Sequence, residues 1–261
     1  MGISGKTFIV SGGAAGLGLA TVQELVSRGA HVAVLDRNTG TTKQRLESAS
    51  VQFFTADVAD ESNLSNAVDA IEQWTQTTRY PLGGLVSAAG VSWASRTIDR
   101  AGEPASLDMF RSVVDINLVG TYSLSVQVAA KLAKLPESAL NDDGERGVII
   151  LVASVAAYEG QTGQVAYAAS KGGVASLVLP MARDLAPWGI RVVGLAPGVF
   201  ETNMTAPMPL KTKKKISAML EFPRRFGQPV EFAKMAAEVI ENGIVNGTVI
   251  RLDGASRMGK L

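Results

Sequence analysis

Short apolar runs alternate along this chain with longer stretches in which apolar residues recur every three or four positions. Runs of strand length are expected at residues 6–10, 31–35, 51–55, 84–87, 147–152, 191–196 and 248–252. Residues 148–152 are apolar at every position, which is typical of strands that are buried on both faces of a parallel sheet.

Helical periodicity is found between these runs, and we expect helices at residues 17–28, 41–48, 60–77, 107–135, 163–188 and 230–241. Pro180 should kink or interrupt its helix. Residues 92–106 are polar and rich in helix breakers, and residues 198–225 have no strong period. The alternation of strands and helices predicts an α/β fold, namely a Rossmann-type doubly wound parallel sheet of about seven strands in a single domain over residues 1–261.

Composition narrows the function further. The 261 residues are 46% hydrophobic and carry a net charge of +1, which argues against a nucleic-acid partner that is held by bulk charge. With no Cys and only one His, we expect no metal site. No apolar run reaches the length of a membrane span, so no membrane partner is expected.

A glycine-rich segment follows the first predicted strand and opens the first predicted helix. Gly12, Gly16 and Gly18 have the spacing G-x-x-x-G-x-G, with Leu17 between the last two. Such glycines let the backbone approach a pyrophosphate, whose charge then faces the amides of the helix N-terminus. A glycine turn without a ligand has the same pattern, so the segment alone leaves cofactor binding open.

Asp36 ends the second predicted strand, where a carboxylate can accept hydrogen bonds from an adenosine ribose and repel a 2′-phosphate. The sequence therefore predicts NAD, with NADP as the less favoured alternative. Arg37 is of the type that holds a 2′-phosphate, but no Lys or Arg lies within residues 12–18 to support it. Asp57 and Val58 end the third strand, where they are expected near the adenine ring.

Tyr167 and Lys171 are four positions apart in a predicted helix, so their side chains share one face. Ser154 follows the buried run at residues 147–152 and can meet this pair. An ammonium group near a phenol lowers the pKa of the phenol toward the working pH, which suits a general acid and base. A solvated i,i+4 pair is the alternative for Tyr167 and Lys171 taken alone.

In chain order, these segments make the sequence similar to the short-chain dehydrogenase/reductase family. The matching residues are Ser11-Gly12-x-x-x-Gly16-x-Gly18, Asp57-Val58, Ala88-Ala89-Gly90, Asn117, Ser154, Tyr167-x-x-x-Lys171 and Pro197-Gly198 with Thr202. The resemblance implies the strand order 3-2-1-4-5-6-7 and an NAD-dependent oxidoreductase that interconverts a secondary alcohol and a ketone. Ser11 departs from the usual Thr, and Ser87-Ala88 replaces the usual Asn pair.

The resemblance also implies the role of each site residue. Tyr167 would be the acid and base, and Lys171 would lower the pKa of Tyr167 and hold the nicotinamide ribose. Ser154 would bind the substrate oxygen, and Asn117 would bind a water that links Lys171 to solvent. Cofactor contacts are implied at Gly12, Gly16, Leu17, Gly18, Asp36, Asp57, Val58, Ala89, Gly90, Tyr167, Lys171, Pro197, Gly198 and Thr202.

Within the family, the segments at residues 92–103, 146–150, 153–157, 159–161, 182–187 and 246–255 are similar to members that act on 3-hydroxyacyl-CoA in fatty-acid or amino-acid breakdown. An acyl-CoA is therefore the expected substrate, with Gln161 and Gln164 as tentative contacts that are equally plausible as surface amides. Residues 198–225 would form a lid, whose Lys211, Lys213, Lys214 and Lys215 either attract the CoA phosphates or form a solvated helix face.

Other functions stay open at this point. A dehydrogenase of a steroid, another small alcohol or a secondary metabolite would use the same scaffold, and some relatives are scaffold subunits of a tRNA-processing complex. The resemblance implies a homotetramer. With strand-like sequence from residue 6, the expected location is cytoplasmic, with the mitochondrial matrix as an alternative. Gly259-Lys260-Leu261 is close to a peroxisomal address, which makes the peroxisome a further alternative.

Overall fold

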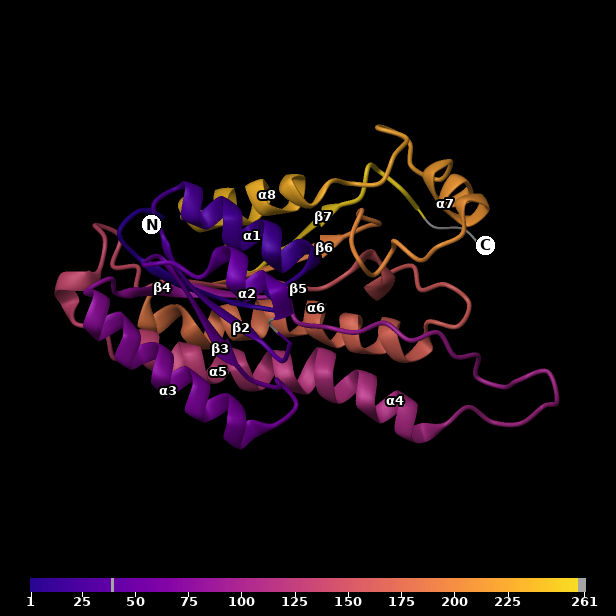
Figure 1. The fold of residues 1–261 in the computed structure, drawn as a ribbon, viewed down its shortest axis with the longest axis horizontal. Coiled ribbons are helices and arrows are strands. Elements are labelled where there is room, and N and C mark those ends of the chain that lie inside the picture. The colour runs from indigo at the N-terminus through magenta and orange to yellow at the C-terminus, as the bar shows by residue number, and fades with distance from the viewer. Residues whose placement is uncertain (39, 258–261) are drawn as a thin grey trace.

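Seven parallel strands form one sheet in the computed structural model, which describes residues 1–38 and 40–257 (Figure 1). The strands are β1 (Thr7–Ser11), β2 (His31–Asp36), β3 (Val51–Thr55), β4 (Leu82–Ser87), β5 (Gly147–Val152), β6 (Ile190–Pro197) and β7 (Val249–Leu252). Their order in the sheet is β3-β2-β1-β4-β5-β6-β7. The Rossmann-type fold and the strand order are thereby confirmed.

Helices cover both faces of the sheet. They are α1 (Gly16–Ser27), α2 (Gly40–Leu46), α3 (Glu61–Thr78), α4 (Leu107–Val114), α5 (Gly120–Ala133), α6 (Val165–Leu185), α7 (Leu210–Ser217) and α8 (Pro229–Glu241). In Figure 1, α1 and α8 lie on one side of the sheet, whereas α3, α5 and α6 lie on the other.

The sheet separates two hydrophobic cores, because successive side chains of a strand point to opposite faces. Ile9 and Ile149 pack with Leu124 of α5 and Val178 of α6. Their neighbours Phe8, Val148 and Ile150 belong to the core on the side of α1 and α8. Each strand is apolar at consecutive positions because both of its faces are buried, as the sequence pattern predicted.

The long helix expected at residues 107–135 has an irregular centre. Between α4 and α5, residues Asp115–Val119 form a π-helical turn that contains Asn117. Such turns insert one extra residue into a helix and are frequent at functional sites. The periodicity of apolar residues does not report this insertion, because the chain stays helical on both sides of it.

Two further expectations need correction. α6 begins at Val165, and it runs through Pro180 to Leu185 as one helix, so the alternative of an interruption is wrong, whereas the kink stays a prediction. Residues 198–225, which showed no strong period, contain α7. α7 is short and its apolar residues are few, which is why no helical pattern stood out.

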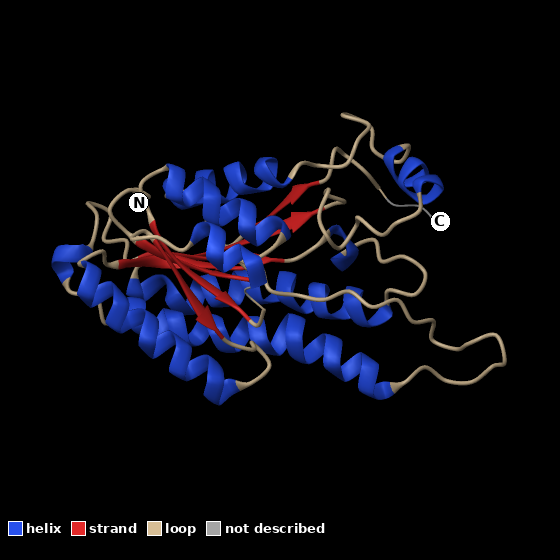
Figure 2. Cartoon of the chain, in the orientation of Figure 1, coloured by secondary structure: helices blue, strands red, loops and turns tan. Residues whose placement is uncertain are grey.

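The strands in Figure 2 point toward the end of the molecule where α7 and the loop at residues 92–106 lie, so the carboxyl ends of the strands open toward both. Two helical stretches, Leu107–Ala133 and Val165–Trp188, are long and apolar enough to cross a membrane by length and composition. The expectation that no stretch reaches this length is therefore wrong. Core helices pass the same test, and both stretches pack on the sheet here. Gly259-Lys260-Leu261 lies outside the described residues.

Candidate active site

A cleft with a volume of about 570 Å³ opens at the carboxyl ends of the strands. The fold brings most of the predicted site residues to its walls, namely Gly12, Gly16, Leu17, Gly18, Asp36, Asp57, Val58, Ala89, Gly90, Ser154, Gln164, Tyr167, Lys171, Pro197, Gly198 and Thr202. Asn117 and Gln161 are not among the residues that line it. Since parallel strands end at the same edge of the sheet, segments far apart in the sequence meet here.

The glycine turn after β1 fits a dinucleotide. A Cβ atom on Gly12 would lie 2.9 Å from the backbone of Ala89, and one on Gly18 would overlap the carbonyl oxygen of Gly12. These two glycines are thus required for the turn itself. Gly16 has a φ of +53° and its missing Cβ would meet only Thr202, at 3.6 Å, so Gly16 is where a pyrophosphate can approach the backbone.

The start of α1 supports the same interpretation. Its N-cap residue, Ala15, has no side chain that could accept a hydrogen bond from the first turn. The residues at this helix end line the cleft, and the N-cap side chain accepts no hydrogen bond from their amides. An anion at this position would supply the acceptors that a Ser or Asp cap provides elsewhere.

The carboxylate of Asp36 is held in place at the end of β2. Its Oδ2 accepts a hydrogen bond from the backbone of Ala14 at 3.1 Å, and its Oδ1 accepts one from Asn38 at 3.0 Å. Arg37 is exposed and lies 3.5 Å from Asp57. The negative charge of Asp36 therefore faces the cleft in a defined orientation, while the charge of Arg37 is directed at Asp57.

Ser154, Tyr167 and Lys171 meet in the middle of the cleft. Ser154 follows β5, where its Oγ accepts a hydrogen bond from the backbone of Ala156 at 3.1 Å and starts a short 3₁₀ turn. The hydroxyl of Tyr167, in the first turn of α6, is hydrogen-bonded to Ser154. Lys171 is buried, and its Nζ donates to the carbonyl oxygen of Val152 at 2.7 Å. This Nζ lies 6.0 Å from the centre of the Tyr167 ring.

The pKa values of this group differ from the sequence-based expectation. Desolvation raises the pKa of the Tyr167 phenol, against which the hydrogen bond from Ser154 acts in the lowering direction. Burial lowers the pKa of Lys171 to about 8. We expected the ammonium to lower the pKa of Tyr167. The structure corrects this, because desolvation dominates and the Nζ is hydrogen-bonded to a carbonyl oxygen.

Asn117 is fully buried in the π-helical turn, beside the cleft. Its Oδ1 accepts from the backbone of Val91 at 2.8 Å, and its Nδ2 donates to the carbonyl of Val91 at 2.9 Å and to Ser170 at 3.0 Å. The side chain therefore ties the loop after β4 to α6. Sequence reasoning missed Ser170, whose only signal is a hydroxyl directly before Lys171 on the catalytic helix.

Ser11, which departs from the family pattern, braces the cofactor side of the cleft. Its Oγ accepts a hydrogen bond from the backbone of Ala89 at 3.2 Å, and its carbonyl accepts one from Ala88. The loop at residues 88–90 is thus held by the end of β1, at the place where Ser87-Ala88 replaces the usual Asn pair.

Of the two residues predicted to contact the substrate, only Gln164 lines the cleft. Its Oε1 accepts from the backbone of Gln161 at 2.9 Å. Gln161 instead donates to the carbonyl of Glu159 at 3.0 Å. In α7, Lys213 lies 3.4 Å from Glu201 and 5.9 Å from the ring of Phe226. The other lysines of this helix, Lys211, Lys214 and Lys215, are exposed.

Known proteins resemble the chain over nearly its whole length. Residues 6–213 match the short chain dehydrogenase family. The chain is 40% identical over 259 residues to 3-hydroxyacyl-CoA dehydrogenase type-2 from Bos taurus, which covers 98% of the chain and 97% of the relative, and equally so to that from Homo sapiens. A crystal structure of 3-hydroxyacyl-CoA dehydrogenase type-2 from Mycobacterium avium superposes with a TM-score of 0.90, at 39% identity and 98% coverage of both chains.

Proposed function

The chain belongs to the short-chain dehydrogenase family and is an oxidoreductase that uses a nicotinamide cofactor, and we propose that it takes NAD and interconverts 3-hydroxyacyl-CoA and 3-ketoacyl-CoA. One observation carries the proposal. Ser154, Tyr167 and Lys171 converge in the same cleft as the glycine turn. A group that can act as acid and base therefore lies in the cleft in which the dinucleotide would bind. The relatives at 40% identity are named for this substrate class.

Each catalytic side chain has a distinct task in this proposal. A bound nicotinamide supplies the acceptor for the hydride of the carbinol carbon. Tyr167 takes the proton of the alcohol during oxidation and returns it to the carbonyl oxygen during reduction. Ser154 stabilises the phenolate form through its hydrogen bond and orients the substrate oxygen. Lys171, with a pKa of about 8, is able to pass a proton on near neutral pH.

NAD is favoured over NADP by the end of β2. The carboxylate of Asp36 is oriented by two backbone amides and adds a negative charge where a 2′-phosphate would have to bind. Arg37, the next residue along the chain, lies 3.5 Å from Asp57.

An acyl-CoA is supported by residues 198–225, which we propose form the lid. Met204 and Met208 line the cleft and offer apolar surface to an acyl chain. Lys211, Lys214 and Lys215 expose their charges on α7 and would attract the phosphates of CoA. Gln164 lines the same cleft, and we propose it as a contact to the thioester.

We propose a homotetramer as the assembly. Large apolar side chains are exposed on α4, α5 and the π-helical turn between them, namely Leu107, Met109, Phe110, Val119, Tyr122 and Val126, and β7 is an edge strand of the sheet that the described residues form. Apolar faces of this kind mark sites of protein association. Light scattering at several concentrations measures the assembly directly, and a monomer would reject it.

The substrate proposal is tested by following NADH oxidation with acetoacetyl-CoA, longer 3-ketoacyl-CoA esters and a panel of free ketones. Acyl-CoA esters should give the highest kcat/KM, and NADPH should be used poorly. A free steroid or sugar ketone as the best substrate would reject the acyl-CoA proposal while leaving the reaction type intact.

A further inference from the structure

We propose that Arg251 is a positioning residue for this reaction, and that it acts by holding Glu159 and residues 155–164 against the end of β7. Its kinetic effect rests on the proposed oxidoreductase reaction at Ser154 and Tyr167. The inference adds a residue from the last strand of the sheet, 92 positions from its partner, to the groups that determine turnover.

Residues 155–164 connect the two catalytic hydroxyls, because the segment begins after Ser154 and ends just before the first turn of α6. After the 3₁₀ turn at Val155–Ala157 it contains local turns, in which Tyr158 donates to Val155 and Gln164 to Gln161. Its last residues also pair with the loop after β4, where Ser95 donates to the carbonyl of Gly163 at 2.8 Å. No side chain from residue 157 to residue 164 is buried. A segment with so little core contact needs other tertiary contacts to keep one position.

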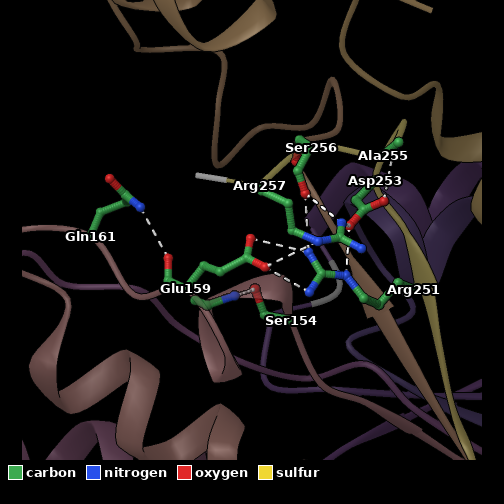
Figure 3. Close-up of polar contacts among 9 residues, drawn as sticks. Ser154, Glu159, Gln161, Arg251, Asp253, Ala255, Ser256 and Arg257 are labelled. Atoms are coloured by element: carbon green, nitrogen blue, oxygen red, sulfur yellow. Dashed lines mark hydrogen bonds and ion pairs between the residues drawn. The ribbon is translucent and has the colours of Figure 1, made fainter. Parts of the chain in front are cut away.

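Arg251 supplies such a contact with a two-pronged ion pair. Its Nη1 lies 2.8 Å from Oε1 of Glu159, and its Nη2 lies 3.1 Å from Oε2 (Figure 3). The guanidinium carbon also stands 5.5 Å from the centre of the Tyr158 ring. Only 23% of the Arg251 side chain and 19% of the Glu159 side chain are exposed, so solvent screens this pair less than a surface pair.

The guanidinium group is itself held by the chain that follows β7. Its Nε lies 2.7 Å from Oδ2 of Asp253, and its Nη2 donates to the carbonyl of Ser256 at 3.1 Å. Arg257 adds a second cation, 3.7 Å from Glu159 and 3.4 Å from Asp253. Figure 3 shows the resulting cluster, in which two arginines and two carboxylates alternate. The contacts with Asp253 and Ser256 thus orient the guanidinium so that its Nη1 and Nη2 donate to Glu159.

The corner after β7 also holds the other walls of the cleft. Gly198 donates to the carbonyl of Leu252 at 2.9 Å, and a Cβ on Gly198 would lie 3.0 Å from Asp253. The carbonyl of Gly254 accepts from Glu221 at 3.0 Å and from Phe222 at 3.3 Å, at the base of the proposed lid. Through this corner, Arg251 fixes the position of residues 155–164, which follow Ser154, relative to the proposed lid and to the loop after β6. Small shifts between such walls are costly for turnover, because reacting groups need a defined separation.

A purely stabilising ion pair would behave differently in kinetics. Its loss would lower the free energy of unfolding and leave kcat/KM of the folded enzyme unchanged. A positioning pair changes kcat/KM for the substrate much more than the affinity for NADH, because the glycine turn and Asp36 lie outside the cluster and only Gly198 among the predicted cofactor residues is joined to the corner after β7.

The test is a double-mutant cycle with Glu159→Gln, Arg251→Gln and the double variant, measured as kcat/KM and as NADH affinity by fluorescence. Each single change should lower kcat/KM on the order of 10-fold to 100-fold. The double variant should lose no more than the worse single variant, and NADH affinity should stay within about twofold. Arg251→Lys, which keeps the charge but not the fork, should recover part of the loss.

Arg28→Lys is the matched control, since Arg28 makes a similar contact to Glu24 on α1 and should leave kcat/KM unchanged. Additive losses in the double variant, an equal loss of NADH affinity, or kcat/KM within about twofold of the native value would each overturn the proposal.

Hydrogen exchange tests the same proposal without a substrate and with the conservative variant Arg251→Lys alone. In Arg251→Lys, peptides that cover residues 155–164 should exchange faster than in the native protein, whereas those of β1 and the glycine turn should not change. Unchanged exchange at residues 155–164 overturns the proposal. If the native protein turns over no acyl-CoA, the substrate proposal fails by itself, and the kinetic arm is read with the best alcohol or ketone of the panel.

Discussion

The side-chain amide of Asn117 is hydrogen-bonded to both backbone polar groups of Val91. The amide accepts from the nitrogen of Val91 at 2.8 Å and donates to its carbonyl oxygen at 2.9 Å. Val91 lies beyond the end of β4, outside the sheet, so the amide of Asn117 supplies the backbone hydrogen bonds that a neighbouring strand would make within it. The contact fixes the loop that carries Gly90 against Lys171, because a Cβ on Gly90 would lie 3.1 Å from Oδ1 of Asn117 and 3.4 Å from Nζ of Lys171.

Replacing this amide should destabilise the fold. In Asn117→Ala, the partly buried backbone groups of Val91 lose their partners, so the free energy of unfolding should fall by about 1 to 3 kcal/mol. Urea denaturation measures the change. Asn66→Ala on the exposed face of α3 is the control and should stay within about 0.5 kcal/mol of the native protein. An equally small effect of Asn117→Ala would contradict the bracing role.

Tyr167→Phe removes the proposed acid and base but keeps the ring. Turnover should fall by about 100-fold to 10,000-fold, because no other group would deliver the proton. NADH binding should survive and is measured by fluorescence titration. Tyr122→Phe, at an exposed tyrosine of α5, should leave turnover unchanged. Substantial residual turnover in Tyr167→Phe would remove this residue from the chemical step.

The lowered pKa of Lys171 makes stability depend on pH. Between about 8 in the folded protein and 10.5 in the unfolded chain, only the unfolded chain holds this proton, so rising pH favours folding. From pH 7 to pH 9, the free energy of unfolding should rise by about 1 kcal/mol relative to Lys171→Met. A constant difference between the two proteins over this range would show that Lys171 is not desolvated.

Lys131→Met serves as the comparison for this measurement. Asp69 and Glu72 raise the pKa of Lys131 by hydrogen bonding to it. The stability it contributes is therefore complete below the unfolded-state pKa of 10.5 and is lost only above it. The difference between native protein and Lys131→Met should stay flat from pH 7 to pH 9.

The charge of Asp36 should control the choice between NAD and NADP. In Asp36→Asn the shape is kept and the repulsion of a 2′-phosphate is lost, so the ratio of kcat/KM for NAD to that for NADP should fall by at least about 10-fold. Initial rates with both cofactors give this ratio. Asp69→Asn, on the surface of α3, should not change it. A ratio that stays constant in Asp36→Asn would move cofactor selection elsewhere in the cleft.

The exposed lysines of α7 should act on CoA esters alone. Reversing the charges of Lys211, Lys214 and Lys215 to Glu should raise KM for an acyl-CoA and leave KM for a small uncharged ketone unchanged. The effect should shrink at high salt. Lys213 is left intact, because its contacts with Glu201 and Phe226 support the segment itself.

The control for the α7 experiment reverses the same number of charges elsewhere, at Lys43 of α2, Lys234 of α8 and Lys134, which follows α5. This protein should keep the native KM for both substrates. An equal rise of KM for the acyl-CoA and the small ketone in the α7 variant would reject electrostatic recognition of the CoA phosphates.

Much of the fold follows from local sequence patterns. Strand β3 and strand β5 have the bounds that the apolar runs predict, because continuous burial leaves a signal in consecutive residues. The glycine turn could also be predicted from local sequence, because a turn with positive φ or a close backbone approach needs glycine at particular positions. Pro180 does not end α6, because the packing of this helix on the sheet and on neighbouring helices outweighs the local effect of a proline.

By itself, the sequence determined the order of strands and helices, the glycine turn and the identity of Ser154, Tyr167 and Lys171. These are written in spacings of a few residues, which reflect the periods of strand and helix. Only the tertiary structure decided how Asn117 is bonded to Val91, which way the pKa values of Tyr167 and Lys171 shift, and that Arg251 holds Glu159. Desolvation and contacts between distant segments depend on how the elements pack, and no local spacing encodes that.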